Sequence, residues 1–274
     1  METEKFANCI YDTPWPAEKA FATKDRLLML DFESDCPSTI LSNVAWYHKP
    51  DEDAKAPHAH TCGEILAFLG SDLEHPEELG GQITMYLNGE KHVMTKSFFV
   101  FIPANLPHCP YSVDRIDRPI FHTSYPISRK MTIRRFPGLP VQPEDAPKFF
   151  DENFVQTLSL PDDYSLYPGE IPILYTDSRV CPGSFMCCAS WYTKADSRPL
   201  IPQSVHACDT LLLIAGSDPA APFDLGGKVN FTIGGERYLI DRTSYLFIPA
   251  GTPYSLDAEE LSRPIILTRT RETN

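Results

Sequence analysis

The chain has few glycines and few basic residues for a sequence of 274 residues. Its 14 glycines stand against 26 prolines. Because proline is excluded from helix interiors and central strand ladders, this balance predicts short strands joined by rigid turns. Lysine and arginine number 24 against 37 aspartates and glutamates, which gives a formal net charge of −13. Such a surface repels phosphate backbones and anionic membranes, so we expect no nucleic-acid or membrane partner.

The sequence also lacks long apolar runs, a signal peptide and a cysteine framework. No apolar run approaches the roughly 18 residues that span a bilayer, and no basic region followed by an apolar run stands at the start. The eight cysteines are too few for a disulfide scaffold and lack paired zinc spacing. With 42% hydrophobic residues, the chain has ample material for packed cores. We therefore expect a globular, cytoplasmic, all-β protein with reduced thiols.

Metal-ligating residue types gather between His58 and His108. Residues two apart in a strand point to the same face, so His58 and His60 present two imidazoles side by side. Glu64 can join them after a bend at Gly63, and His108 adds a third imidazole if it returns on a neighbouring strand. Imidazole nitrogens with one carboxylate suit iron, manganese, nickel, cobalt, copper or zinc.

The pattern H-x-H-x3-E, followed about 40 residues later by P-x-[GN]-x-x-H, resembles the two motifs of the cupin superfamily. The resemblance implies a double-stranded β-helix barrel that binds one divalent metal per chain, with iron as the first choice. The implied ligands are His58, His60, Glu64 and His108. Two glycines of the usual motifs are replaced by Glu52 and Asn105. Both departures fall on turn residues, and asparagine tolerates left-handed backbone.

The chain repeats itself at an offset of 146 residues. Gly70-Ser71-Asp72 recurs as Gly216-Ser217-Asp218, and Phe101-Ile102-Pro103-Ala104 recurs as Phe247-Ile248-Pro249-Ala250. This duplication predicts two tandem cupin barrels, the arrangement of a bicupin. The predicted division is an N-terminal barrel with the metal site at 1–127, a proline-rich linker and crossover at 128–172, and a C-terminal barrel at 173–274.

The second copy lacks the metal-ligating set. The equivalents of the four ligands are Ser204, His206, Thr210 and Tyr254. One imidazole with three hydroxyl groups makes a poor divalent site, so we expect the C-terminal barrel to bind no metal. The framework of the repeat persists without these ligands. The fold alone therefore does not force histidines into those positions.

Three functions are compatible with this site. Four protein ligands on an octahedral metal leave two open positions, which favours an Fe(II)-type dioxygenase acting on a small oxygenated organic molecule. Alternatively, the metal acts as a Lewis acid beside a base, as in an isomerase, dehydratase or decarboxylase. A non-catalytic small-molecule-binding bicupin is the third reading. By analogy with other cupins we expect a homodimer.

Two residues could assist catalysis near the metal. His122 lies on the expected last strand of the first barrel and is replaced by Leu267 in the second copy, so it could act as a base or be satisfied in the barrel wall. Tyr47 could donate to an oxyanion, but Tyr192 persists in the metal-free copy, which favours a structural role. The basic stretch 128–135 could hold an anionic substrate group or form a solvated linker face.

The other histidines and cysteines carry weaker signals. His48, His75 and His92 lack a ligand constellation, and we expect them on the surface. Cys62 falls between two ligands but repeats as Cys208 beside the degenerate site. That repetition favours a small buried hydrophobe over a thiolate ligand.

Overall fold

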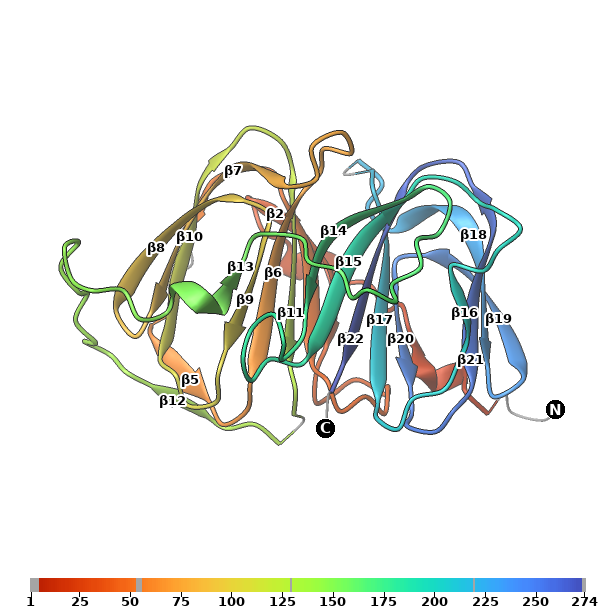
Figure 1. Ribbon diagram of the computed structural model, residues 1–274, viewed down its shortest axis with the longest axis horizontal. Coiled ribbons are helices and arrows are strands. Elements are labelled where there is room, and N and C mark those ends of the chain that lie inside the picture. The colour runs from red at the N-terminus through yellow and green to blue at the C-terminus, as the bar shows by residue number, and fades with distance from the viewer. Residues whose placement is uncertain (1–4, 53–55, 129, 219, 273–274) are drawn as a thin grey trace.

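The computed structural model describes residues 5–52, 56–128, 130–218 and 220–272. Two β-barrels lie side by side along the long axis of the molecule (Figure 1). The helices among the described residues are three short 3-10 turns: η1 (Ala7–Cys9), η2 (Ala17–Lys19) and η3 (Asp151–Asn153). Within these residues, no helix is long and apolar enough to cross a membrane. The predicted all-β class with two tandem barrels is confirmed.

Two sheets form the N-terminal barrel. The first has the order β13-β9-β6-β11-β3-β2, with bounds Phe154–Val155, Phe98–Ile102, Glu64–Gly70, Ile120–Pro126, Ser42–Tyr47 and Lys24–Leu30. The second has the order β12-β5-β10-β7-β8, with bounds Ile133–Arg135, His58–His60, His108–Ile116, Glu78–Leu87 and Glu90–Lys96. A short strand, β4 (Asp51–Glu52), also pairs with β10.

The C-terminal barrel repeats this plan. Its first sheet has the order β1-β20-β17-β22-β15-β14, with bounds Ile10–Tyr11, Ser244–Ile248, Thr210–Gly216, Ile265–Arg271, Met186–Tyr192 and Glu170–Thr176. Its second sheet has the order β16-β21-β18-β19, with bounds Ile201–Ser204, Tyr254–Leu261, Asp224–Ile233 and Glu236–Arg242. Equivalent strands of the two barrels begin at equivalent residues of the repeat. β6 begins at Glu64, and its counterpart β17 begins at Thr210.

Alternation along β6 decides which side chains enter the first barrel. Leu66 and Phe68 belong to the core inside this barrel, whereas Ile65 and Leu69 belong to the core shared with the second barrel. Successive strand residues point to opposite faces. Glu64 has the parity of Leu66 and Phe68 and therefore points into the barrel.

The two barrels share one hydrophobic core between their large sheets. Trp46 of β3 stacks on Trp191 of β15 with ring centroids 6.5 Å apart, and both side chains are fully buried. The Ser42 hydroxyl donates a hydrogen bond of 2.7 Å to the Tyr245 hydroxyl across the same interface. Phe101 also lies in this shared core. The barrels therefore pack as one body.

The β7–β8 hairpin has the turn that its sequence predicts. Asn88 and Gly89 have φ angles of 47° and 80°, and the flanking residues Leu87 and Glu90 pair with each other. Positive φ at both turn residues is the type I′ geometry that Asn-Gly favours. This hairpin fixes the register of β7, on which β10 and its first residue, His108, are paired.

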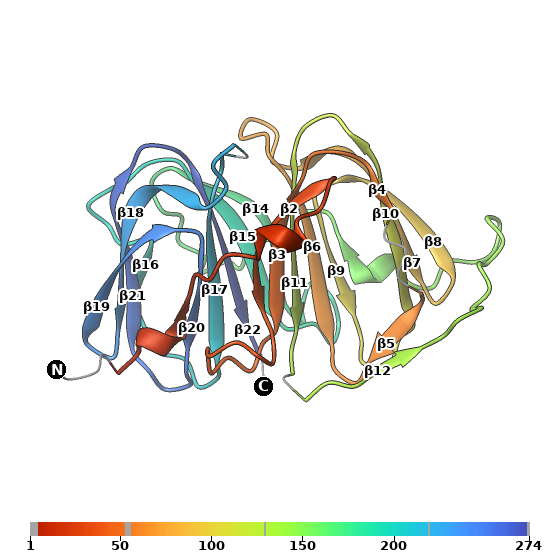
Figure 2. The same cartoon turned by 180° about the vertical axis from the view of Figure 1, so that it is seen from behind.

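Strand pairings cross the predicted domain boundaries. From the linker, β12 pairs with β5 and β13 pairs with β9, so both extend the N-terminal barrel. From the N-terminus, β1 pairs with β20 of the C-terminal barrel. Figure 2, the view from behind, shows the N-terminal segment running across the near side of that barrel before it enters β2. The division of the chain at residues 127 and 172 stays a prediction. Relative to that division, β12 and β13 of the linker join the N-terminal barrel, and β1 joins the C-terminal barrel.

Replacing Trp46 by alanine should lower the free energy of unfolding by about 3–5 kcal/mol, because it leaves a cavity in the core that both barrels share. Phe149→Ala is the control, since Phe149 is 72% exposed. Urea unfolding followed by circular dichroism measures both. A loss below about 1 kcal/mol for Trp46→Ala would contradict the shared core.

Candidate metal centre

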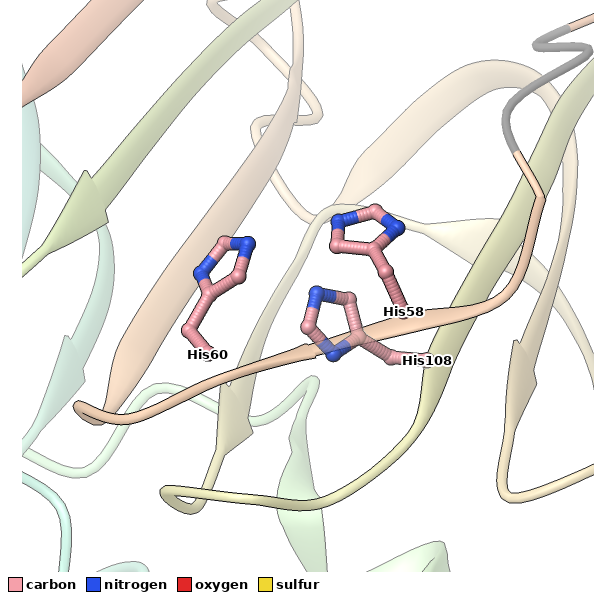
Figure 3. Close-up of side chains that lie close together, drawn as sticks. All are labelled: His58, His60 and His108. Atoms are coloured by element: carbon pink, nitrogen blue, oxygen red, sulfur yellow. The ribbon is translucent and has the colours of Figure 1, made fainter. Parts of the chain in front are cut away.

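Three strands bring the predicted ligands together in the N-terminal barrel. His58 and His60 lie on β5, Glu64 begins β6, and His108 begins β10. The Cα atoms of His58 and His108 are antiparallel partners. Figure 3 shows the three imidazole rings gathered in one space.

The ring centroids of the three histidines lie 4.5–5.1 Å apart. One nitrogen from each of His58, His60 and His108 lies within 4.8 Å of the other two. Glu64 Oε2 lies 3.4 Å from His60 Nδ1 and 3.4 Å from His108 Nε2. The four side chains therefore converge as the sequence predicts, and their arrangement could hold one metal ion. That they bind a metal stays a prediction.

Backbone carbonyls fix the tautomers of two rings. The Nδ1–H of His58 donates to Ala56 O at 3.1 Å, and the Nδ1–H of His108 donates to Leu106 O at 2.9 Å. An imidazole that donates through Nδ1 keeps its lone pair on Nε2. Such carbonyl partners orient metal-binding histidines and raise their basicity. Sequence spacing did not reveal these two carbonyls, because each belongs to the turn just before its histidine.

The electrostatics favour a neutral His58 ring and a charged Glu64 carboxylate. Burial lowers the pKa of His58, and the nearby His108 lowers it further. Burial alone would raise the pKa of Glu64, but the contact with His108 and the charge that the three histidines carry when protonated outweigh it, so the pKa of Glu64 is lowered. Deprotonated imidazole and ionised carboxylate are the forms that bind metals. The donor set therefore fits a first-row divalent ion.

A cavity of about 810 Å³ opens onto the three histidines and Glu64. One wall comes from β5, β10 and β12, and the other from β2, β3, β6 and β11. Its lining near the ligands includes Leu66, Tyr111, His122 and Ser124. The volume falls within the range of small-molecule sites.

His122 lines this cavity, whereas Tyr47 stands behind it. The Nδ1–H of His122 donates to Ala67 O at 2.9 Å, and the ring stacks on Phe68 at a centroid distance of 4.2 Å. The Tyr47 hydroxyl lies 2.8 Å from the hydroxyl of Tyr111, a lining residue. Tyr47 therefore reaches the cavity through Tyr111 and through His122, whose ring it meets edge-on at a centroid distance of 5.9 Å.

Cys62 lies outside the ligand cluster. It occupies the turn between β5 and β6, and burial raises its pKa to about 11. A protonated thiol is a poor ligand. Cys109 is buried and lines the cavity next to His108.

In the second barrel an arginine occupies the place of the ligand cluster. Arg271 pairs with Thr210, just as Pro126 pairs with Glu64 in the first barrel. Its Nη1 lies 2.8 Å from His206 Nδ1 and 2.7 Å from His206 Nε2. A fixed guanidinium repels a cation, which agrees with the prediction that this barrel binds no metal.

Glu90, His92 and Asp151 form a second group of metal-ligating types. The prediction of a surface position for His92 is wrong, because its side chain is 3% exposed. His92 Nε2 lies 3.0 Å from Glu90, and Nδ1 lies 3.1 Å from Asp151. Glu90 also accepts the backbone N–H groups of Phe149 and Phe150. The two carboxylates face opposite nitrogens of one ring, so we interpret the group as a structural tie between β8 and the linker.

Glu90→Gln should lower the free energy of unfolding by about 1–3 kcal/mol, because it weakens the hydrogen bonds that a buried carboxylate accepts. Glu236, its counterpart in the repeat, is the matched control and should cost less when changed to glutamine, since it is more exposed. Metal content should stay the same in both variants. Loss of metal from Glu90→Gln would contradict the structural interpretation.

No protein-family profile matches this sequence, and no curated protein matches it. Solved structures share its fold. AerE from Microcystis aeruginosa superposes with a TM-score of 0.54 at 11% identity, over 97% of this chain and 100% of that one. A variant of salicylate 1,2-dioxygenase from Pseudoaminobacter salicylatoxidans, in complex with gentisate, superposes with a TM-score of 0.53 at 11% identity, over 89% of this chain and 74% of that one.

At 11% identity, these two structures show that the chain shares their fold. Together with the duplicated motifs and the two barrels of two sheets each, they agree with the resemblance to cupins that the sequence motifs show. The chain has the fold of a bicupin, two cupin barrels in tandem.

Proposed function

We propose that this protein is a metal-dependent cupin enzyme, specifically an Fe(II)-type dioxygenase acting on a small oxygenated organic molecule. The observation that carries the proposal is the convergence of three imidazoles and one carboxylate on the wall of a cavity of about 810 Å³. A pure binding protein has no need of such a donor set. The neighbouring salicylate 1,2-dioxygenase structure, bound to gentisate, supports oxygen chemistry at the level of shared fold.

We assign separate roles to the metal ligands, to the carbonyls that orient them and to the apolar lining of the cavity. His58, His60, Glu64 and His108 would hold the metal, which supplies open coordination positions for a substrate oxygen and for dioxygen. The carbonyls of Ala56 and Leu106 keep two of these rings in the ligating tautomer. Apolar lining residues limit the water that reaches the substrate.

His122 is the residue we propose for moving or holding a substrate proton. It lines the cavity, and its hydrogen bond to Ala67 O with its stacking on Phe68 fixes the plane of the ring. We propose a supporting role for Tyr47, which orients the Tyr111 hydroxyl at the cavity wall. Lys24 Nζ donates to the Tyr47 hydroxyl at 3.0 Å and holds it from the other side.

The protein should contain one metal per chain, and His58→Ala/His60→Ala should lose it, because two of four ligands are removed. His206→Ala is the control in the second barrel and should keep the metal. Elemental analysis of protein purified without a metal-affinity tag, after anaerobic loading with iron, measures all three. Equal metal content in wild type and the double variant would contradict the ligand assignment.

Iron-loaded protein should consume oxygen with a substrate from the diketones, catechols, flavonols or hydroxylated aromatic acids. His122→Gln should slow turnover by about 10²-fold or more without changing metal content, if the ring moves a proton. An oxygen electrode with product analysis measures both. Metal-dependent turnover without oxygen uptake would favour an isomerase, dehydratase or decarboxylase instead. No turnover with any of these classes would sink the dioxygenase proposal.

The remaining partner predictions accompany this proposal. We propose a homodimer with a small-molecule substrate, in the cytoplasm, with no nucleic-acid or membrane partner. The formal net charge of −13 supports the last point, because it repels polyanionic surfaces.

A further inference from the structure

A strand from the linker completes the wall beside the metal centre. β12 pairs antiparallel with β5, with Ile133 opposite His60, Arg134 opposite Ala59 and Arg135 opposite His58. Directly opposed residues in an antiparallel pair lie on the same face, with Cβ atoms roughly 4.5–5.5 Å apart. Arg135 therefore shares the face of His58, and Arg134 lies on the other face.

The cavity lining agrees with this register. Ile133 and Arg135 both line the cavity, whereas Arg134 does not. Arg134 instead lies over the ring of Phe136, 4.9 Å from its centroid. Among the described residues, none forms a hydrogen bond or ion pair with the Arg135 side chain. A guanidinium beside the ligand cluster is thus available to a bound molecule.

The facing wall holds a second guanidinium, which lies against aromatic rings. Arg26 of β2 lines the same cavity, and its guanidinium carbon lies 4.8 Å from the ring centroids of both Trp15 and Phe21. Asp31 and Glu33 also line this wall. The Asp31 carboxylate is engaged, since it accepts the Glu33 N–H at 3.0 Å and the Ser34 hydroxyl at 3.1 Å.

We propose that Arg135 binds the carboxylate of the substrate, so that the substrate class is a small organic acid. The planar guanidinium matches a carboxylate in a bidentate pair. Ile133, 54% exposed and on the same face, offers apolar contact to the body of that acid. One guanidinium neutralises the single negative charge of a carboxylate. A phosphate dianion would leave one negative charge uncompensated near the Glu64 carboxylate, which would repel it. The proposal rests on the proposed function of the metal centre and names its substrate class.

The test compares Arg135→Gln with Arg134→Gln, its neighbour on the opposite face of the same strand. The probes are benzoate, 2-hydroxybenzoate and oxalate, with benzamide, 2-hydroxybenzamide and oxamide as uncharged counterparts and phenyl phosphate as the dianion. Isothermal titration calorimetry measures binding to wild type and both variants. Each protein is titrated in metal-free and iron-loaded form under anaerobic conditions, with metal content measured in the same samples.

Wild type and Arg134→Gln should bind at least one carboxylate about tenfold or more tightly than its amide, because the charge-assisted pair is lost with the amide. Arg135→Gln should lose this preference while keeping its metal content and melting temperature. Retention of the preference in Arg135→Gln, its absence from wild type, or tighter binding of phenyl phosphate than of every carboxylate would overturn the proposal. Metal-free titrations separate the two proposals, since failure to bind metal contradicts the metal centre and leaves the carboxylate preference measurable.

Discussion

The pairing of His58 with His108 across β5 and β10 is the constraint on which the site depends. It places two imidazoles on one face, and the period of two along β5 adds His60 to the same face. Register in a sheet is strict, because a slip of one residue turns every side chain to the other face. The Asn88-Gly89 turn helps to set that register, since it fixes β7, on which β10 is paired. A turn 19 residues before His108 in the sequence therefore controls where that ring points.

The duplication shows which parts of the barrel serve the fold and which serve the site. Both barrels keep the strand order, and their large sheets pack through Trp46 and Trp191. The ligand positions diverge, and Arg271 brings a fixed positive charge against His206 where the first barrel has its ligand cluster. Such a charge repels a divalent cation, which supports the prediction that the second barrel binds no metal.

Much of the fold and of the ligand cluster was predictable because both rest on local patterns. The offset repeat gave two barrels, and alternation placed His58 and His60 together, with Glu64 following after one bend. The sequence marked the basic stretch 128–135 as a possible anion site but could not place Arg135 beside the ligands, because that position depends on the pairing of β12 with β5, which six other strands separate in the sequence. His92 was misjudged for a similar reason. Its burial comes from η3 and the linker, which fold back over β8.

Anomalous diffraction from crystals of iron-loaded protein, recorded at the iron absorption edge, tests the central claim most directly. The account predicts one peak per chain in the N-terminal barrel, within bonding distance of His58, His60, Glu64 and His108. A peak at Glu90, His92 and Asp151, a peak inside the C-terminal barrel, or no peak in iron-loaded crystals would contradict it.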